Sequence, residues 1–240
     1  MPVRLAQYAD LLPASKLLAT AFFDEDLFGS LMHPHRNEYP DEVYLTHLSH
    51  LRQGSFSPCA TVIVSHAPET PRTITGVAVW EWKGRKADEL ESSHSLETWW
   101  KWGAGKAMTA WEVVEGVVWP NRALDPEQKD VLERSYPFIE HYWEVPERKE
   151  CYYLALCGVD PKAQGKGYGK ELVQWGLAKA EAEGVCCGLI SALGKEPFYR
   201  KCGFGEQVGW ASEGEGNPIK DVPGGAILFT LRLGKRDGEE

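Results

Sequence analysis

A glycine-rich turn between a buried strand and a helix constrains this chain more than any other feature of its sequence. Residues 152–159 (YYLALCGV) form an apolar run with the length and composition of a buried strand. Asp160-Pro161 ends this run, because proline lacks an N–H and restricts the residue before it. The turn QGKGYG follows at 164–169, and apolar residues at three- and four-residue spacing then predict a helix over 170–183.

Such a turn is suited to bind phosphate. Residues without a Cβ let successive backbone N–H groups point at one ligand, and the helix dipole adds about half a positive charge there. Lys162, Lys166 and Lys170 add positive charge beside the glycines. The spacing excludes a Walker loop and a GxGxxG dinucleotide fingerprint, because lysine stands where each motif needs its last glycine. A tight connection without a ligand is the alternative interpretation.

The turn and its surroundings together resemble a known family. The pattern Gln-x-x-Gly-x-Gly at 164–169, with the strand before it and Phe-Tyr-x-x-x-Gly-Phe at 198–204 after it, resembles the GNAT acyl-CoA N-acyltransferases. Residues 189–204 look like the fungal small-molecule-type branch of that family. The resemblance implies an α/β fold whose mixed, mostly antiparallel sheet is flanked by helices. It also implies that acetyl-CoA lies between two splayed strands, here 152–159 and 185–191.

The resemblance carries specific roles onto residues of this sequence. Backbone groups of Cys157, Gly158 and Val159 would pair with the pantetheine arm, Gly158 would allow the bulge that opens the gap, and Ser191 would contact the arm from the other strand. Tyr199 holds the position that commonly donates a proton to the leaving thiolate, and a phenol with a pKa near ~10 is protonated at neutral pH; a core aromatic is the alternative. The pyrophosphate would be held by Gln164, Gly165, Lys166, Gly167, Tyr168, Gly169 and Lys170.

The acceptor side is less defined. Many members of the family carry Glu, Asp or His on the strand at the position of Tyr153, so the base is left open among Glu81, Glu144 and His141. Glu81 shares a strand face with two valines and lies either at an exposed strand end or towards a pocket. The expected substrate-binding residues are Phe28, Trp80, Glu81 and Tyr153. In the family the segment after the first helix borders the acceptor pocket, which adds Asp24, Glu25, Asp26 and Met32 as candidates, with a solvated acidic loop as the alternative.

Residues 83–148 depart from the minimal core of the family. We expect a tryptophan-rich helical insertion with helices over 95–119 and 126–139, laid over an antiparallel hairpin of strands 61–66 and 74–82. Its tryptophans either pack the insertion on the sheet or line the acceptor pocket. One domain is expected over 1–234 and a frayed tail over 235–240. The remaining expected elements are a helix capped by Asp10, helices at 42–53 and 197–201, and strands at 3–7, 206–211 and 226–233.

Composition excludes several classes of function. With 26 basic and 35 acidic residues the net charge is −9, which argues against a dedicated nucleic-acid or anionic-membrane binder. We find neither an apolar run long enough to span a membrane nor a signal-peptide pattern, so a cytoplasmic protein is expected. The six cysteines show no CxxC spacing, which predicts reduced thiols and no metal site.

The sequence therefore predicts an acetyl-CoA-dependent N-acetyltransferase that acts on the amine of a small molecule by direct attack in a ternary complex. Acetylation of a peptide N-terminus or lysine is one alternative. A catalytically silent acyl-CoA-binding domain is another, favoured by Tyr153 in place of a strand acid and opposed by Tyr199. The sequence leaves open whether the chain is a monomer or a homodimer.

Overall fold

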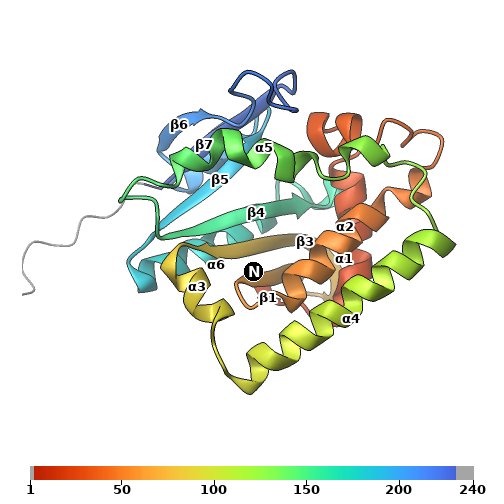
Figure 1. The fold of residues 1–240 in the computed structure, drawn as a ribbon, viewed down its shortest axis with the longest axis horizontal. Coiled ribbons are helices and arrows are strands. Elements are labelled where there is room, and N and C mark those ends of the chain that lie inside the picture. Colours follow the sequence, from red (N-terminus) through yellow and green to blue (C-terminus); the bar gives the residue numbers. More distant parts are fainter. Residues whose placement is uncertain (1–2, 231–240) are drawn as a thin grey trace, which may run out of the picture.

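A mixed β-sheet forms the scaffold of the computed structural model, which describes residues 3–230 except for the side chains of 70–72. In the described chain the sheet has seven strands in the order β1-β2-β3-β4-β5-β7-β6 (Figure 1). Only β4 and β5 run parallel, so the predicted mostly antiparallel sheet is confirmed. The strands are β1 (Val3–Leu5), β2 (Ala60–Ala67), β3 (Thr70–Lys83), β4 (Cys151–Val159), β5 (Cys186–Ala192), β6 (Glu206–Trp210) and β7 (Gly224–Phe229). The end of the last predicted strand, 231–233, and the predicted tail, 235–240, lie outside the described residues.

Helices cover both faces of the sheet. Helix α6 (Tyr168–Glu183) packs on one face, and α1 (Tyr8–Ala21) and α2 (Tyr44–Phe56) pack on the other. Strand β3 divides its residues between these layers, since Ala78 and Trp80 belong to the α6 core while Val77 and Val79 belong to the α1/α2 core. The short helix α7 (Glu196–Cys202) follows β5 and carries the Phe-Tyr motif.

The segment after the first strand differs in detail from the prediction. Asp10 does not cap α1; the helix begins at Tyr8, and the Asp10 carboxylate accepts the Gln7 N–H at 2.7 Å. After α1 the chain forms a π-helical turn, η1 (Asp26–Leu31), and a 3₁₀ turn, η2 (Pro40–Glu42). The carboxylate of Glu25 accepts the N–H groups of Leu27 and Phe28 at 3.0 and 2.6 Å, so it fixes the start of η1.

The insertion is helical, as predicted, but only part of it lies against the hairpin of β2 and β3. It contains α3 (Arg85–Glu91), α4 (Leu96–Val118) and α5 (Val131–Ile139), with 3₁₀ turns at Pro126–Gln128 and Glu140–Tyr142. The expectation that it covers the hairpin holds for α3, which contacts β3, but is wrong for α4, which packs along α2 at the edge of the molecule (Figure 1). Of its tryptophans, Trp143 packs on the sheet against Tyr153 and Phe229, whereas five others are at least half exposed: Trp99, Trp100, Trp102, Trp111 and Trp119.

Candidate active site

A gap opens where the two parallel strands part. Strands β4 and β5 pair from Cys151 and Cys186 to Leu154 and Leu189, and no described pairing joins them beyond that point. The break coincides with a bulge in β4, since Val79 and Trp80 of β3 face Leu156 and Leu154 and leave Ala155 as the extra residue. A bulge bends its strand and strengthens the local twist, which turns the end of β4 away from β5.

The bulge is at Ala155, and its prediction at Gly158 is wrong. Gly158 lies in register opposite Val77, in the regular part of the β3–β4 ladder. Its missing Cβ serves the packing of α1 instead, because a Cβ there would lie 2.5 Å from Cδ2 of Leu18.

The alternation of the backbone decides which groups of β4 face the gap. The Asp160 N–H donates to the Thr75 carbonyl of β3 at 3.0 Å. Residues two apart on a strand point their backbone groups the same way, so Gly158 is directed towards β3 and Cys157 and Val159 are directed into the gap. Two of the three predicted backbone partners therefore face the gap, and Gly158 does not.

The gap continues into a cavity of about 300 Å³. Its wall includes Cys157, Ser191 and Tyr199, which were predicted around the acyl-donor site. It also brings together predicted acceptor-side residues, namely Glu25, Phe28 and Tyr153. Six side chains from distant segments of the chain therefore line one cavity.

Tyr199 has the protonation state that a proton donor needs. Its ring packs edge-on against Phe198 and Phe204, with centroids 5.0 and 6.1 Å apart. Burial raises the pKa of the phenol well above its usual range, and the neighbouring Cys157 raises it further. Burial also raises the pKa of Cys157 to about 12, so its sulfur is a thiol rather than a nucleophilic thiolate at neutral pH.

A second cavity, of about 260 Å³, adjoins the first. The two share Phe28, Leu132, Ala155 and Leu156, so they meet at the bulge. Glu81 lines the second cavity, which resolves its predicted alternatives in favour of a pocket-facing position. His50 of α2 lines it as well and was missed by the sequence analysis. The available signal was a second histidine, His47, three residues earlier on the same face of a predicted helix.

His50 is set up as a neutral imidazole. Its ring meets Phe28 edge-on at a centroid distance of 6.4 Å, in a cluster that also contains His47. Burial lowers the pKa of His50 from its usual value, and the nearby His33 lowers it further. His50 therefore offers a free nitrogen lone pair at neutral pH, which is what a general base needs.

The glycine turn has the backbone that phosphate binding requires. Gly165 and Gly167 have left-handed φ angles of 76° and 90°, which residues with a side chain rarely adopt. Gly167 is the N-cap of α6, which begins at Tyr168, two residues before the predicted start. No described atom lies within 4 Å of a Cβ built on Gly165, so the turn is open on that side. Lys162, Lys166 and Lys170 are exposed around it, whereas the Tyr168 side chain is buried under the turn.

Several predicted residues lie outside both cavities. Trp80 is fully buried on the opposite face of the sheet, where its indole N–H donates to the Leu172 carbonyl at 3.3 Å, so its expected place in the acceptor pocket is wrong. Met32 is a core residue beneath α5. Asp24, His141 and Glu144 are exposed, because their loops turn outward, and they line neither cavity.

Two further properties concern the described residues alone. Within residues 3–230, no group of three or more His, Cys, Asp or Glu side chains is placed to hold a metal ion, and no helix is both long and apolar enough to cross a membrane. The six cysteines are free thiols, and five of them are buried.

The site combines parted parallel strands, a bulge, an open glycine turn at a helix N-terminus and a buried tyrosine. A model of the acetyltransferase (GNAT) family matches residues 136–204. An acetyltransferase structure from Corynebacterium glutamicum, titled histone acetyltransferase HPA2 and related acetyltransferase, shares the fold: TM-score 0.58 and 15 % identity over 98 % of this chain and 97 % of that one. A polyamine N-acetyltransferase from Drosophila melanogaster does so with a TM-score of 0.51 and 14 % identity over 97 % and 99 %. Residues 136–204 thus match the GNAT acetyltransferase family, and the chain shares its fold with acetyltransferase structures.

Proposed function

We propose that this protein transfers the acetyl group of acetyl-CoA to the amine of a small molecule, by direct attack within a ternary complex. One observation carries the proposal: the cavity that contains Tyr199 and the cavity that contains His50 and Glu81 meet at the bulge of Ala155. A donor in the first cavity and an amine in the second would meet where β4 and β5 part. The Drosophila relative, named for the formation of N-acetylagmatine, supports a small amine as the acceptor class.

The residues present fit acetyl-CoA. When bound, acetyl-CoA supplies an acetyl group already activated as a thioester. The left-handed Gly165 and Gly167 leave the N–H groups at the start of α6 free to hold the pyrophosphate. Cys157 and Val159 direct backbone groups into the gap, where they would pair with the pantetheine arm as a neighbouring strand does.

Tyr199 and Cys157 determine the course of the reaction. The neutral phenol of Tyr199 donates a proton to the leaving sulfur, which would otherwise hold its charge inside a poorly solvated cleft. Because Cys157 remains a thiol, it forms no acetyl-enzyme, and the amine itself attacks the carbonyl.

His50 and Glu81 divide the acceptor chemistry between them. An amine must lose a proton before it attacks, and the neutral imidazole of His50 accepts that proton, directly or through a water. Glu81 faces the same cavity and attracts the cationic form of the amine to it.

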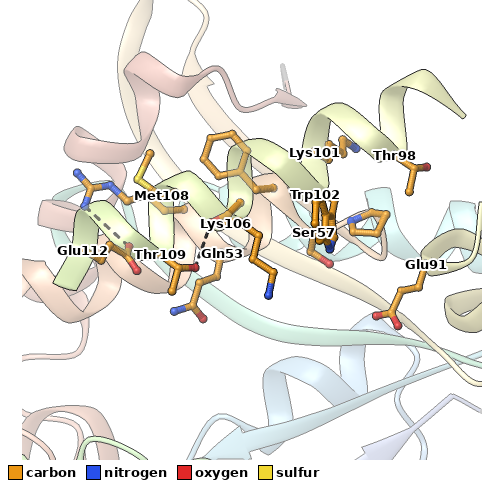
Figure 2. Close-up of a pocket in the computed structure, with 14 residues that line it drawn as sticks. Gln53, Ser57, Glu91, Thr98, Lys101, Trp102, Lys106, Met108, Thr109 and Glu112 are labelled. Carbon is orange, nitrogen blue, oxygen red and sulfur yellow. Dashed lines mark hydrogen bonds and ion pairs between the residues drawn. The ribbon is translucent and has the colours of Figure 1, made fainter. Parts of the chain in front are cut away.

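A groove next to the acceptor cavity favours peptide acetylation as the second candidate. The groove, of about 460 Å³, lies between α2 and α4 and shares Gln53 and Ser57 with the acceptor cavity. Figure 2 shows Gln53 and Ser57 beside Trp102, Lys106 and Thr109 of α4. An acceptor longer than a small amine, such as a peptide N-terminus, would extend into this groove. The Corynebacterium structure, titled a histone acetyltransferase, gives this candidate further support.

A thiol-release assay with acetyl-CoA separates these functions. The acceptor panel contains agmatine, spermidine, an arylalkylamine and a short peptide with a free N-terminus. We expect turnover with at least one small amine and little with the peptide; the reverse order would select the second candidate. Thermal stabilisation by acetyl-CoA without thiol release from any acceptor would instead identify a silent binding domain.

The pH profile of the active enzyme tests the role of His50. Because burial lowers the pKa of His50, activity should persist as pH falls to about 6.5 and decline only below that value, where the imidazole becomes protonated. His50→Gln should lower kcat by about 10²-fold or more and remove this limb of the profile. The matched variant Glu81→Gln should chiefly raise the acceptor KM and keep the limb. A limb that disappears in Glu81→Gln but persists in His50→Gln would transfer the role of base to Glu81.

A further inference from the structure

Helix α4 differs from an ordinary surface helix because its apolar side faces solvent. The side that packs on α2 carries two carboxylates: Glu112 accepts from Ser49 at 3.0 Å, and Glu115 pairs with Arg52 at 2.5 Å. The apolar or small residues of α4 that line the groove beside α2 are Trp102, Gly105 and Met108. None of the 23 residues of α4, all of which the structure describes, is buried. A surface helix normally directs its apolar stripe at the core and its charges at solvent. The inward carboxylates therefore leave most apolar residues of α4 exposed and facing away from the protein.

The outward side carries a regular seam. Seven apolar or small residues recur at alternating spacings of four and three: Leu96, Trp100, Gly103, Ala107, Ala110, Val114 and Val117. This is the a/d repeat of a coiled coil, sustained over three heptads. All seven are exposed, Leu96 to 90 %, Trp100 to 75 % and Val117 to 80 %. None of the five charged residues of α4 occupies a seam position.

The outward side of α4 exposes a large apolar area. Taking ~150–250 Å² for a whole tryptophan side chain, the exposed parts of Trp99, Trp100 and Trp111 amount to roughly 300–450 Å². Leu96, Val114, Val117 and Val118 add to this area. The largest apolar patch of a typical monomer is about 300–600 Å², and each partner in a standard interface buries about 800 Å². The outward side of α4 is therefore comparable with the largest apolar patch of a typical monomer, and patches of that size are often functional.

The order of side-chain sizes along the seam fits a second copy of the same helix. Large residues stand at both ends, Leu96 and Trp100 at one and Val114 and Val117 at the other, with Gly103, Ala107 and Ala110 between them. Small residues in the middle let two helix backbones approach closely, and large ones fill the space where crossing helices diverge. A two-fold axis between Ala107 and Ala110 pairs these two residues with each other and Trp100 with Val117, so an antiparallel pair is self-complementary.

The charges argue against a membrane as the occupant. Helices that bind anionic bilayers carry basic residues along the rim of their apolar face. Helix α4 has two lysines against three glutamates, and the whole chain has a net charge of −9. Such a helix gains no attraction from an anionic lipid surface.

We propose that α4 forms a homodimer by antiparallel pairing of the seam with the α4 of a second copy. In this register Gly103 faces Val114 of the other copy, and Ala107 faces its Ala110. The groove of Figure 2 lies on the opposite side of α4, between α4 and α2, and stays open in the dimer. Dimerisation holds α4, and with it this groove, next to the acceptor cavity.

Sedimentation velocity of the full chain over 1–100 μM tests the pairing, with two matched tryptophan variants. Trp100→Glu places a charge in the seam, whereas Trp102→Glu makes the same change at an exposed tryptophan of α4 outside it. We expect the parent and Trp102→Glu to sediment as dimers and Trp100→Glu as a monomer, with at least a hundredfold weaker association. A monomeric parent at 100 μM, or a Trp100→Glu protein that remains dimeric, would overturn the proposal. Circular dichroism checks that both variants keep the helix content of the parent.

Two further measurements test the arrangement and the partner. Gly103→Cys and Val114→Cys proteins are mixed and oxidised; antiparallel pairing predicts a disulfide between the unlike chains, and disulfides between like chains would overturn it. Flotation with phosphatidylserine vesicles should leave the protein unbound. If the parent is monomeric and floats with the vesicles, and Trp100→Glu does not float, a lipid surface rather than a second copy covers the seam.

Discussion

Helices α6 and α4 are the two long helices on opposite sides of this molecule, and they use their apolar residues in opposite ways. Helix α6 buries Leu172, Val173 and Gly176 against the sheet and directs its charges at solvent. Helix α4 directs Glu112 and Glu115 at α2 and leaves its tryptophans and valines exposed. The same apolar periodicity predicts both helices. It does not say whether the apolar side faces the protein's own core or another molecule.

The two helices also differ in how closely their glycines are packed. A Cβ on Gly176 of α6 would lie 2.1 Å from the ring of Trp80, so this glycine is required for the contact between helix and sheet. A Cβ on Gly103 or Gly116 of α4 would meet no described atom within 4 Å. The apolar side of α6 is thus packed against the protein's own sheet, whereas no described part of the chain packs on Gly103 or Gly116 of α4.

The largest effect is expected from a substitution at the N-terminus of α6, where we propose that the pyrophosphate binds. Gly167→Val forces a β-branched residue into a left-handed conformation and places its side chain where the pyrophosphate would lie. We expect loss of measurable acetyl-CoA binding, seen as loss of the thermal shift that acetyl-CoA gives the parent. Gly184→Val is the matched control, because Gly184 caps the other end of α6 with a φ of 66°. Gly184→Val should lower the stability by a comparable amount but keep the thermal shift with acetyl-CoA. Equal shifts in both variants would show that the glycine turn does not bind acetyl-CoA.

Tyr199→Phe tests the chemistry of the cleft with little change in packing. The substitution removes one oxygen from a ring that Phe198 and Phe204 already hold in place. We expect kcat to fall by about 10–10³-fold while the affinity for acetyl-CoA is retained, because water replaces the phenol only in part. An unchanged kcat, with chemistry shown to be rate-limiting, would exclude Tyr199 as the proton donor. Loss of folding together with binding would make it a core residue.

Much of the cleft could be predicted from the sequence because its parts are local. The strand at 152–159, the glycine turn, the helix and the Phe-Tyr motif are all written in one stretch of the chain, and their order fixes the site. The bulge was misplaced because Gly158 has the usual chemistry of a bulge, whereas register places the extra residue at Ala155. His50 was missed because its role depends on α2 lying against β3, a contact between distant segments.

The positions of the tryptophans could not be predicted from the sequence. Tryptophans suggest burial, so Trp80 and the tryptophans of α4 were assigned together to the acceptor pocket or to packing on the sheet. Trp80 lies instead under α6, because strand alternation places it on the opposite face from Glu81. The tryptophans of α4 are exposed, and two of the inward positions of that helix hold the carboxylates that bond to Ser49 and Arg52.

Gly176→Ala tests how tightly the α6 side is closed. The added methyl group must displace either the helix or the ring of Trp80, and overpacking of this kind typically costs about 1–3 kcal/mol. The gain in helix propensity of about 1 kcal/mol offsets part of that cost, so we expect a net loss in urea unfolding. The difference of these two amounts is a net loss of at most about 2 kcal/mol. In a Trp80→Phe background the same change should cost less, because the smaller ring leaves room for the methyl group. Additive effects of the two changes would show that the ring is not what excludes a side chain at Gly176.

The smallest expected effect is the change in stability on replacing single glycines of α4 by alanine. Gly116→Ala in α4 adds a methyl group in open space at a position outside the seam, so the gain in helix propensity should appear undiminished. We expect a stabilisation of about 0.5–1 kcal/mol, or about 1–4 °C in Tm for a chain of this size. Gly103→Ala makes the same change in equally open space within one chain, but at a seam position. At concentrations where the protein is monomeric the two variants should gain alike. Where it is dimeric, Gly103→Ala should gain less, because its methyl group meets the second copy at the close approach. Equal gains at every concentration would mean that nothing covers the seam at Gly103, and the contrast between α4 and α6 would then be one of exposure alone.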